Sequence, residues 1–229
     1  MNELIDIYLA PRNVFNKLKE KPKWITPFII VLIIFMIASA ITVSMTKDTL
    51  MAKQEETLRT RGLPDTQIAQ AMKFFQGPLP IIFGAIGAAL AYVIIMIVFA
   101  LILNLFIPVF GGNALYKNVF SVVCFSSMIM IPASILKIIL IAITKSPYVA
   151  TSLALFVPNL VKTSFSYQLL NSFDFFVIWE MILVAIGISI TNEIKQKNAY
   201  ILVFLIWFAS ILIGIGLGSV ASLKVTPSS

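Results

Sequence analysis

The chain contains 229 residues, of which 59% are hydrophobic and only 12% are charged. A soluble domain carries about a quarter charged residues, because polar side chains must cover its outer surface. The composition therefore excludes a water-soluble globular domain and predicts an integral membrane protein. There is no histidine, and the single cysteine, Cys124, lies in an apolar run. We therefore expect no enzymatic activity, catalytic residue, metal site, cofactor or internal disulfide.

The net charge of +7 would suggest nucleic-acid binding in a soluble protein. In this chain the basic residues lie mostly in short segments beside apolar runs, where they orient the chain and meet lipid phosphates. We therefore expect membrane lipids as partners and no nucleic acid.

Residues 1–24 precede the first apolar run and carry apolar side chains at helical spacing among five basic residues. This pattern predicts an amphipathic N-terminal arm with a basic rim. An interfacial helix on an anionic leaflet explains the composition, and a docking face for another protein is the alternative. The apolar positions are Leu4, Ile5, Tyr8, Leu9, Val14, Phe15 and Leu18.

Five apolar runs are close to the length of about 20 residues that a helix needs to cross the hydrocarbon core. They predict an all-α, polytopic membrane helical bundle with five transmembrane helices. Pro132 and Lys137 interrupt the third run. We expect the membrane domain to cover 25–222 and a short tail to occupy 223–229. The predicted spans are 25–45, 81–103, 119–143, 173–191 and 199–220.

The loop at 46–78 is rich in helix-forming charged residues, and Gly62 and Pro64 divide it. Asp65 suits the N-cap of a second short helix. We expect a small helical hairpin against the membrane surface, either as a connector or as the binding surface for an extracytoplasmic partner. The second helix has an apolar stripe of Ile68, Ala69, Met72 and Phe75.

The apolar stretch 148–157 is only about ten residues long, too short to cross the membrane. We expect an interfacial or re-entrant helix that ends near Pro158. The alternative is that this stretch joins the residues after it to make a sixth span.

Counting basic residues under the positive-inside rule does not determine the membrane orientation, because eight Lys and Arg residues fall on each side of the five spans. The first flank usually dominates, and five basic residues precede the first span. We therefore expect a cell-membrane protein with a cytoplasmic N-terminus and an outside C-terminus.

Three ionisable residues lie within the predicted spans: Lys137, Asp174 and Glu180. Lys137 and Glu180 lie roughly 10 Å below the same membrane face at a rise of 1.5 Å per residue. We expect a buried ion pair between them, with an ion or proton pathway and snorkelling of Lys137 as alternatives. Asp174 lies nearer the interface and suits a helix cap as well as a functional role.

Two pairs of small residues four apart would let helices approach closely: Gly84 with Ala88, and Gly214 with Gly218. We expect packing within one chain, and homodimerisation through Gly214 and Gly218 is the alternative.

Three groups of residues together resemble the Yip1 family of small multispanning membrane proteins. They are the segments 10–15 and 21–27, then Phe110-Gly111-Gly112 with the later Pro132, then 170–179 with the later Gly187. Phe173 departs from the leucine that the family often carries there. The family-like positions are Pro11, Phe15, Pro22, Trp24, Gly111, Gly112, Pro132, Asp174, Trp179 and Gly187.

The resemblance implies a five-span bundle with a cytosolic N-terminus and no recognised enzymatic activity. Eukaryotic relatives bind small GTPases through a longer N-terminal region, a role that we do not carry over. Some bacterial relatives resemble accessory membrane subunits linked to ABC-type export systems or envelope stress.

Two functional hypotheses follow. The first is a non-enzymatic scaffold or accessory subunit that binds a membrane-protein partner in the bilayer. The second is a small channel or transporter with a polar path near Lys137, Glu180 and Asn104.

Overall fold

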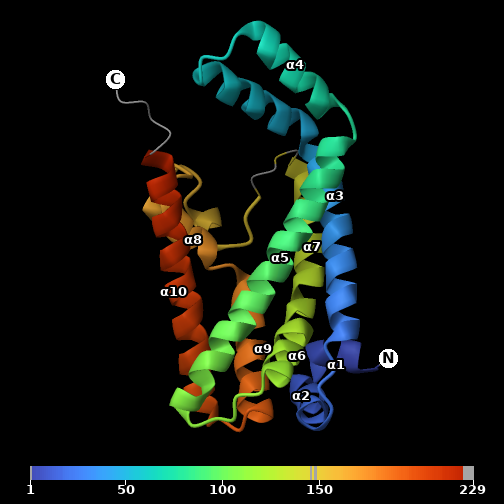
Figure 1. Cartoon of the computed structure of the whole chain (residues 1–229), viewed down its shortest axis with the longest axis vertical. Coiled ribbons are helices and arrows are strands. Elements are labelled where there is room, and N and C mark those ends of the chain that lie inside the picture. Colours follow the sequence, from blue (N-terminus) through green and yellow to red (C-terminus); the bar gives the residue numbers. More distant parts are fainter. Residues whose placement is uncertain (1, 145, 147–148, 224–229) are drawn as a thin grey trace. The chain divides into compact units, whose positions relative to one another are not determined.

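The computed structural model describes residues 2–144, 146 and 149–223. Tyr148 and nearly all of the predicted tail at 223–229 therefore lie outside the described residues. The described part of the chain contains α-helices and 3₁₀ turns and no β-strand, which confirms the all-α prediction (Figure 1).

The five predicted apolar runs are all helical. Four stretches are long and apolar enough to cross a membrane, and a fifth apolar helix, α9, is shorter with 17 residues. The four stretches are α3 (Ile25–Thr60), α5 (Leu79–Phe106) with the 3₁₀ turn η1 (Ile107–Phe110), α6 (Tyr116–Ser126) continued by α7 (Met130–Thr144), and α10 (Gln196–Leu223); α9 covers Phe175–Thr191.

The chain forms two compact units that interleave along the sequence. The first unit contains Met1–Ile29, Met96–Met130 and Ala150–Ser229. The second contains Ile30–Ile95 and Ile131–Val149. The predicted membrane domain at 25–222 contributes to both.

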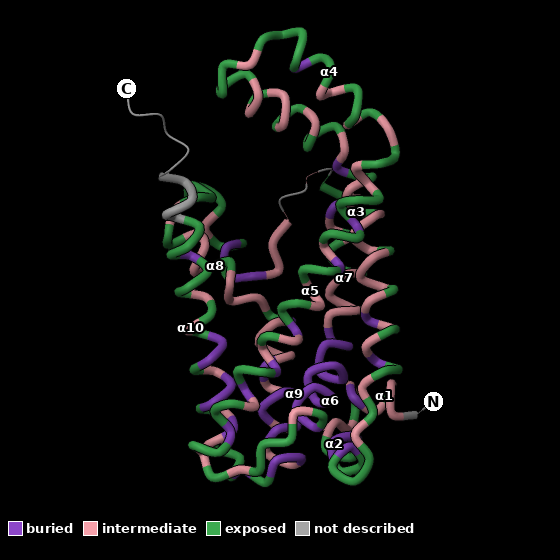
Figure 2. Tube along the Cα trace, in the orientation of Figure 1, coloured by how far each residue is buried: buried purple, intermediate pink, exposed green. Residues whose placement is uncertain are grey.

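The core of the first unit is built around α9, which packs against α2 (Pro11–Glu20), α6 and α10. Helix α6 is buried over nine consecutive residues, 118–126. A helix that is buried on all sides belongs to a core rather than to a surface. Figure 2 shows the buried segments gathered on α2, α6, α9 and the adjoining part of α10.

The N-terminal arm folds as α1 (Asn2–Leu9) and α2, with Pro11 in the first turn of α2. Val14, Phe15 and Leu18 on α2 are no more than 2% exposed. This finding corrects the prediction of a simple interfacial helix, because the chain itself covers the apolar face of α2. Outward-facing apolar side chains remain on α1, where Leu9 is 80% exposed.

The close packing of α2 on α9 depends on Gly187. A Cβ added at Gly187 would lie 2.9 Å from Cε1 of Phe15 and closer still to Cγ1 of Val122. Real Cβ atoms do not approach other heavy atoms this closely. Residue 187 therefore has to be glycine if α2, α6 and α9 are to meet as they do.

Helix α6 is separated from α7 by the 3₁₀ turn η2 (Ser127–Ile129). Pro132 has no N–H to donate to the carbonyl of Met128 four residues earlier. The hydroxyl of Tyr8 donates to that carbonyl at 2.6 Å. The break in the helix therefore lies one turn before Pro132, whereas Lys137 interrupts only the apolar character of the run and lies inside α7.

In the described part of the stretch expected as an interfacial helix, 149–157, the only helical element is the 3₁₀ turn η3 (Leu153–Phe156). Its backbone pairs with the start of α9 instead: Leu153 N–H donates to the Phe173 carbonyl at 3.2 Å, and Phe175 N–H donates to the Thr151 carbonyl at 3.4 Å. These two bonds supply partners to backbone groups of residues 151 and 153 outside any helix. The short helix α8 (Phe165–Ser172) follows, and neither element is long enough to cross a membrane.

Helix α3 continues without a break for 36 residues, of which 25–29 belong to the first unit and the rest to the second. At 1.5 Å per residue it is about 54 Å long, far more than a bilayer core requires. The first arm of the predicted hairpin is thus the continuation of the first span. The chain turns at Gly62, where φ is +74°, and enters α4 (Asp65–Gln76).

Asp65 does not cap α4 as predicted, because Pro64 occupies the N-cap position. The Asp65 carboxylate instead accepts a hydrogen bond at 2.8 Å from Arg59, which also donates to Glu55 at 2.9 Å. These contacts join the end of α3 to the start of α4 across the turn. Within the same unit, Phe35 of α3 and Tyr92 of α5 stack with ring centroids 4.7 Å apart.

At the glycines predicted to permit helix packing, an added Cβ would make no close contact with the described residues. A Cβ at Gly84 would have Val43 Cγ2 as its nearest neighbour at 3.8 Å, an ordinary contact, and a Cβ at Gly214 would meet no described atom within 4 Å. At Gly218 the nearest atom is Gln168 Oε1 at 3.9 Å. Homodimerisation through Gly214 and Gly218 stays a prediction.

The Gly187→Val variant is expected to destabilise the protein by about 1–3 kcal/mol, because the added side chain overpacks the contact with Phe15 and Val122. Thermal unfolding of the purified protein in detergent checks this. Gly216→Val on α10 is the matched control, since a Cβ at Gly216 meets no described atom within 4 Å. Equal melting temperatures for the two variants would contradict the role of Gly187.

Candidate functional site

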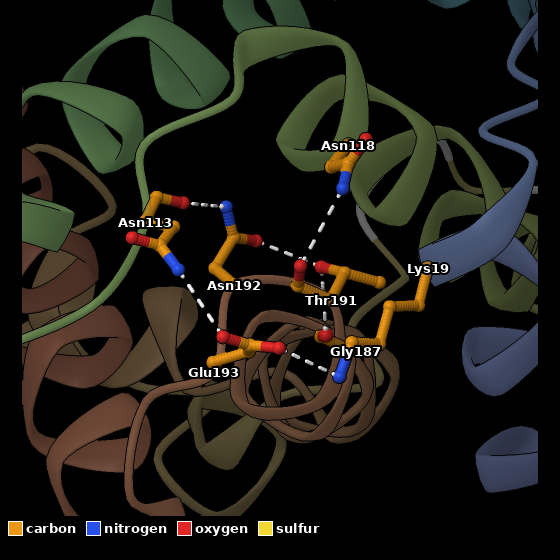
Figure 3. A network of polar contacts seen from close by, with 7 residues as sticks. All are labelled: Lys19, Asn113, Asn118, Gly187, Thr191, Asn192 and Glu193. Atoms are coloured by element: carbon orange, nitrogen blue, oxygen red, sulfur yellow. Dashed lines mark hydrogen bonds and ion pairs between the residues drawn. The ribbon is translucent and has the colours of Figure 1, made fainter.

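One end of the first unit brings together three segments that are far apart in the sequence: α2, the turn at 111–115 and the turn at 192–195 (Figure 3). We call this polar cluster the N-terminal junction. The predicted topology assigns the same three segments to one side of the membrane. The junction consists of Lys19, Asn113, Asn118, Gly187, Thr191, Asn192 and Glu193.

The turn at 111–115 approaches the end of α9 at the backbone level. Gly111 has φ of +80°, a left-handed conformation that glycine adopts without strain. A Cβ on Gly112 would lie 2.8 Å from the Asn192 carbonyl oxygen and closer still to the Ile194 side chain. Both family-like glycines are therefore required by the geometry of the turn.

Asn192 is fully buried and holds the two turns together. Its Nδ2 donates to the Asn113 carbonyl at 2.7 Å, while the Asn113 N–H donates to the Asn192 carbonyl at 2.9 Å. The Thr191 hydroxyl lies 2.7 Å from Asn192 Oδ1, and Asn118 Nδ2 donates to the Thr191 carbonyl at 3.4 Å. This reciprocal bonding satisfies polar groups that would be costly if buried without partners.

Glu193 links the junction to the N-terminal arm. Its carboxylate lies 2.8 Å from the Lys19 ammonium and accepts a hydrogen bond from Asn113 Nδ2 at 3.2 Å. The hydrogen bond and the charge of Lys19 lower the pKa of the Glu193 carboxyl. Both side chains are about half exposed, so the pair contributes little stability and mainly selects how α2 docks. Glu193 has φ of +59°, uncommon for a residue other than glycine.

Sequence reasoning missed most of the junction. None of Asn113, Asn118, Asn192 and Glu193 was singled out as a candidate. The available signal was the polar run Thr191-Asn192-Glu193 between two apolar helices, which marks a turn but does not reveal its partner.

Several family-like residues surround the junction and position the arm. Pro22 lies two residues after the end of α2, directly after the C-cap Lys21, and a proline there cannot continue the helix. The Trp24 ring packs edge-on against Phe120 of α6 with centroids 5.4 Å apart, and against Phe28 at 5.9 Å. The proline, phenylalanine and tryptophan of the predicted motif thus dock the arm.

Asp174 and Trp179 lie along α9, away from the junction motif. Asp174 caps α9 by accepting from the Phe176 N–H at 2.8 Å, and the Thr151 hydroxyl also donates to its carboxylate. The proposed cap is therefore present. The Trp179 ring contacts Phe175, one turn earlier, at 5.7 Å between centroids.

Glu180 lies within α9 and its Oε1 is 2.8 Å from the Ser127 hydroxyl. Lys137 is exposed on α7 and belongs to the second unit. The contacts within either unit do not test the predicted pair of Lys137 and Glu180, which stays a prediction.

The chemistry that the N-terminal junction offers is hydrogen bonding between amides and one ion pair. Among the described residues, no group of three His, Cys, Asp or Glu side chains could hold a metal ion. This arrangement can hold the basic helix α2 in a fixed position at one face of the membrane.

The Asn192→Ala variant is expected to loosen the arm by about 1–3 kcal/mol, because the buried side chain of Asn192 and its hydrogen bond to the Asn113 carbonyl are lost. Hydrogen exchange of residues 11–20 measures this directly. Asn16→Ala, at an exposed position on α2, serves as the control. Unchanged exchange in Asn192→Ala would show that the junction does not hold the arm.

If Lys137 and Glu180 pair, Lys137→Leu alone should lower the yield of folded protein, because it leaves Glu180 without its counter-charge. The double variant with Glu180→Leu should recover much of this loss, with a coupling of at least about 1 kcal/mol. Unfolding of the four members of the cycle in detergent supplies the numbers. Strict additivity would rule the pair out.

Comparison with known proteins places these features in a family. The sequence profile of the Yip1 domain matches residues 5–218. The chain is 26% identical over 200 residues to the membrane protein YknW of Bacillus subtilis (strain 168), an alignment that covers 86% of this chain and 82% of that protein. No solved structure matches the chain. Because the profile match extends from α1 into α10, this multi-pass membrane protein belongs to the Yip1 domain family.

Proposed function

We propose that this protein is a non-enzymatic scaffold or accessory subunit of the cell membrane that binds another membrane protein. In this proposal the N-terminus is cytoplasmic and the C-terminus is outside. The setting we propose is an ABC-type export system or a response to envelope stress, as the family resemblance implies.

The observation that carries the proposal is the ordered helical hairpin at 47–76, made of the last part of α3 and all of α4. Connections between helices usually need only a handful of residues. Within α4 only Ile68 is buried, so most of its side chains are available to a partner. A long, structured and mostly exposed hairpin is better suited to binding than to connecting.

The exposed face of α3 supports binding in the bilayer as well. Apolar side chains recur every four residues along it and are at least 40% exposed. In a membrane such a stripe meets either lipid or another transmembrane helix. The stripe consists of Ile25, Ile29, Ile33, Ile37, Ile41 and Met45.

Site-specific photocrosslinking in native membranes tests the proposal. A photoreactive residue at Gln67 or Lys73, both exposed on α4, should capture one defined membrane protein. The same residue at Leu217, 67% exposed on α10, is the control for general contact with lipid and abundant proteins. In the protein without a crosslinker, deleting residues 47–76 should abolish co-purification of that protein after gentle solubilisation.

Recovery of only lipid and self-crosslinks from Gln67 and Lys73 would refute the scaffold role.

A small channel or transporter is the second candidate, and polar groups within the first unit favour it. Glu180 bonds to Ser127, and Asn104 Oδ1 and Ser126 Oγ are buried without a hydrogen-bond partner among the described residues. Flux into liposomes that is lost in Glu180→Gln would support transport.

A further inference from the structure

The second unit contains an apolar groove between α3, the end of α4 and the start of α5. Its volume is about 360 Å³, within the range of about 300–1,000 Å³ that is usual for small-molecule sites. Most of its lining is aliphatic or aromatic, including Val43, Met51, Phe75 and Ile81. We call it the α3–α5 groove.

The groove lies where the chain changes from apolar to polar. Val43 is near the end of the uncharged first run, whereas Lys47 and Lys53 follow it on the same helix. On the α5 side, Pro80 and Gly84 belong to the first turns of the second apolar run. The groove therefore extends across the expected boundary between hydrocarbon and headgroups.

The charged side chains that line the groove are all basic. Lys47 and Lys53 both line the groove, and among the described lining residues there is no aspartate or glutamate. Lysine side chains at a membrane boundary extend their ammonium groups toward the headgroups. An occupant with an apolar chain and an anionic head matches this distribution.

The groove volume of about 360 Å³ favours a narrow occupant over a helix. Lys47 Nζ donates to the Gln76 carbonyl at 2.5 Å, which joins the wall formed by α3 to the end of α4. A helix with its side chains is about 10–12 Å wide, whereas an acyl chain is much thinner.

We propose that the α3–α5 groove is a binding site for one anionic phospholipid of the bilayer. Its acyl chain lies against Val43, Met51 and Ile81, and its phosphate lies toward Lys47 and Lys53. Seven of the eleven described lining residues belong to the 47–76 hairpin, but lipid binding at this site requires no partner protein.

Native mass spectrometry of the purified full-length protein tests the site. The probes are phosphatidylglycerol and phosphatidylcholine with identical acyl chains. We expect one retained phosphatidylglycerol, bound at least about tenfold more tightly than phosphatidylcholine. Equal retention of the two lipids, or a retained peptide or second copy of the chain in place of lipid, would overturn the proposal.

Two sets of variants locate the site. Gly84→Leu should fill the groove and weaken retention about tenfold, because a Cβ at Gly84 fits beside Val43 and the rest of the side chain extends into the space. Gly87→Leu is the matched control on the same helix, outside the groove lining. Equal loss in both variants would overturn the location.

The charge test is independent of the packing test. Lys47→Gln with Lys53→Gln should remove the preference for phosphatidylglycerol over phosphatidylcholine, while Lys73→Gln, on α4 and outside the lining, should keep it. Unchanged melting temperatures show that each variant is folded. A preference that survives in the double variant would rule out the proposed phosphate contact.

Discussion

The close approach of α2, α6 and α9 at Gly187 is the constraint on which the rest of the first unit depends. Only the missing side chain at this position lets Phe15 and Val122 meet over α9. Burial of the apolar face of α2 then brings Lys19 to Glu193 and Tyr8 to the Met128 carbonyl. A basic amphipathic segment thereby becomes part of the protein core instead of lying on lipid.

Polar groups inside this apolar protein gather where helices are interrupted. At the end of α9 the Asn192 side chain donates to the Asn113 carbonyl, and before its start the backbones of Phe173 and Phe175 pair with residues 151–153. At the break at η2, Pro132 has no N–H to donate to the Met128 carbonyl, and the Tyr8 hydroxyl donates to it. Such interruptions are tolerated in a membrane when protein groups replace the missing hydrogen bonds. They also fix where the N-terminal arm docks.

The second unit follows a different principle. Helix α3 is continuous because its sequence has no glycine or proline between Pro27 and Gly62, so nothing stops it at the membrane boundary. Its extension and α4 form a hairpin that the Arg59 contacts with Glu55 and Asp65 support. The unit therefore combines an apolar span with a charged extension, and both the proposed partner surface and the proposed lipid site depend on that combination.

The sequence by itself determined the helical class, the positions of the five apolar runs, the α4 helix and the cap at Asp174, because local periodicity and composition encode these features. Only the tertiary structure decided that the apolar face of α2 packs on α9, that 151–153 pairs with the start of α9, and that Gly112 and Gly187, rather than Gly84 and Gly214, permit close contact. A glycine motif indicates that another segment could pack closely against the helix at that position. Whether a segment does pack there depends on residues far away in the chain. Asn192 shows the same limit, since its partner Asn113 lies 79 residues away.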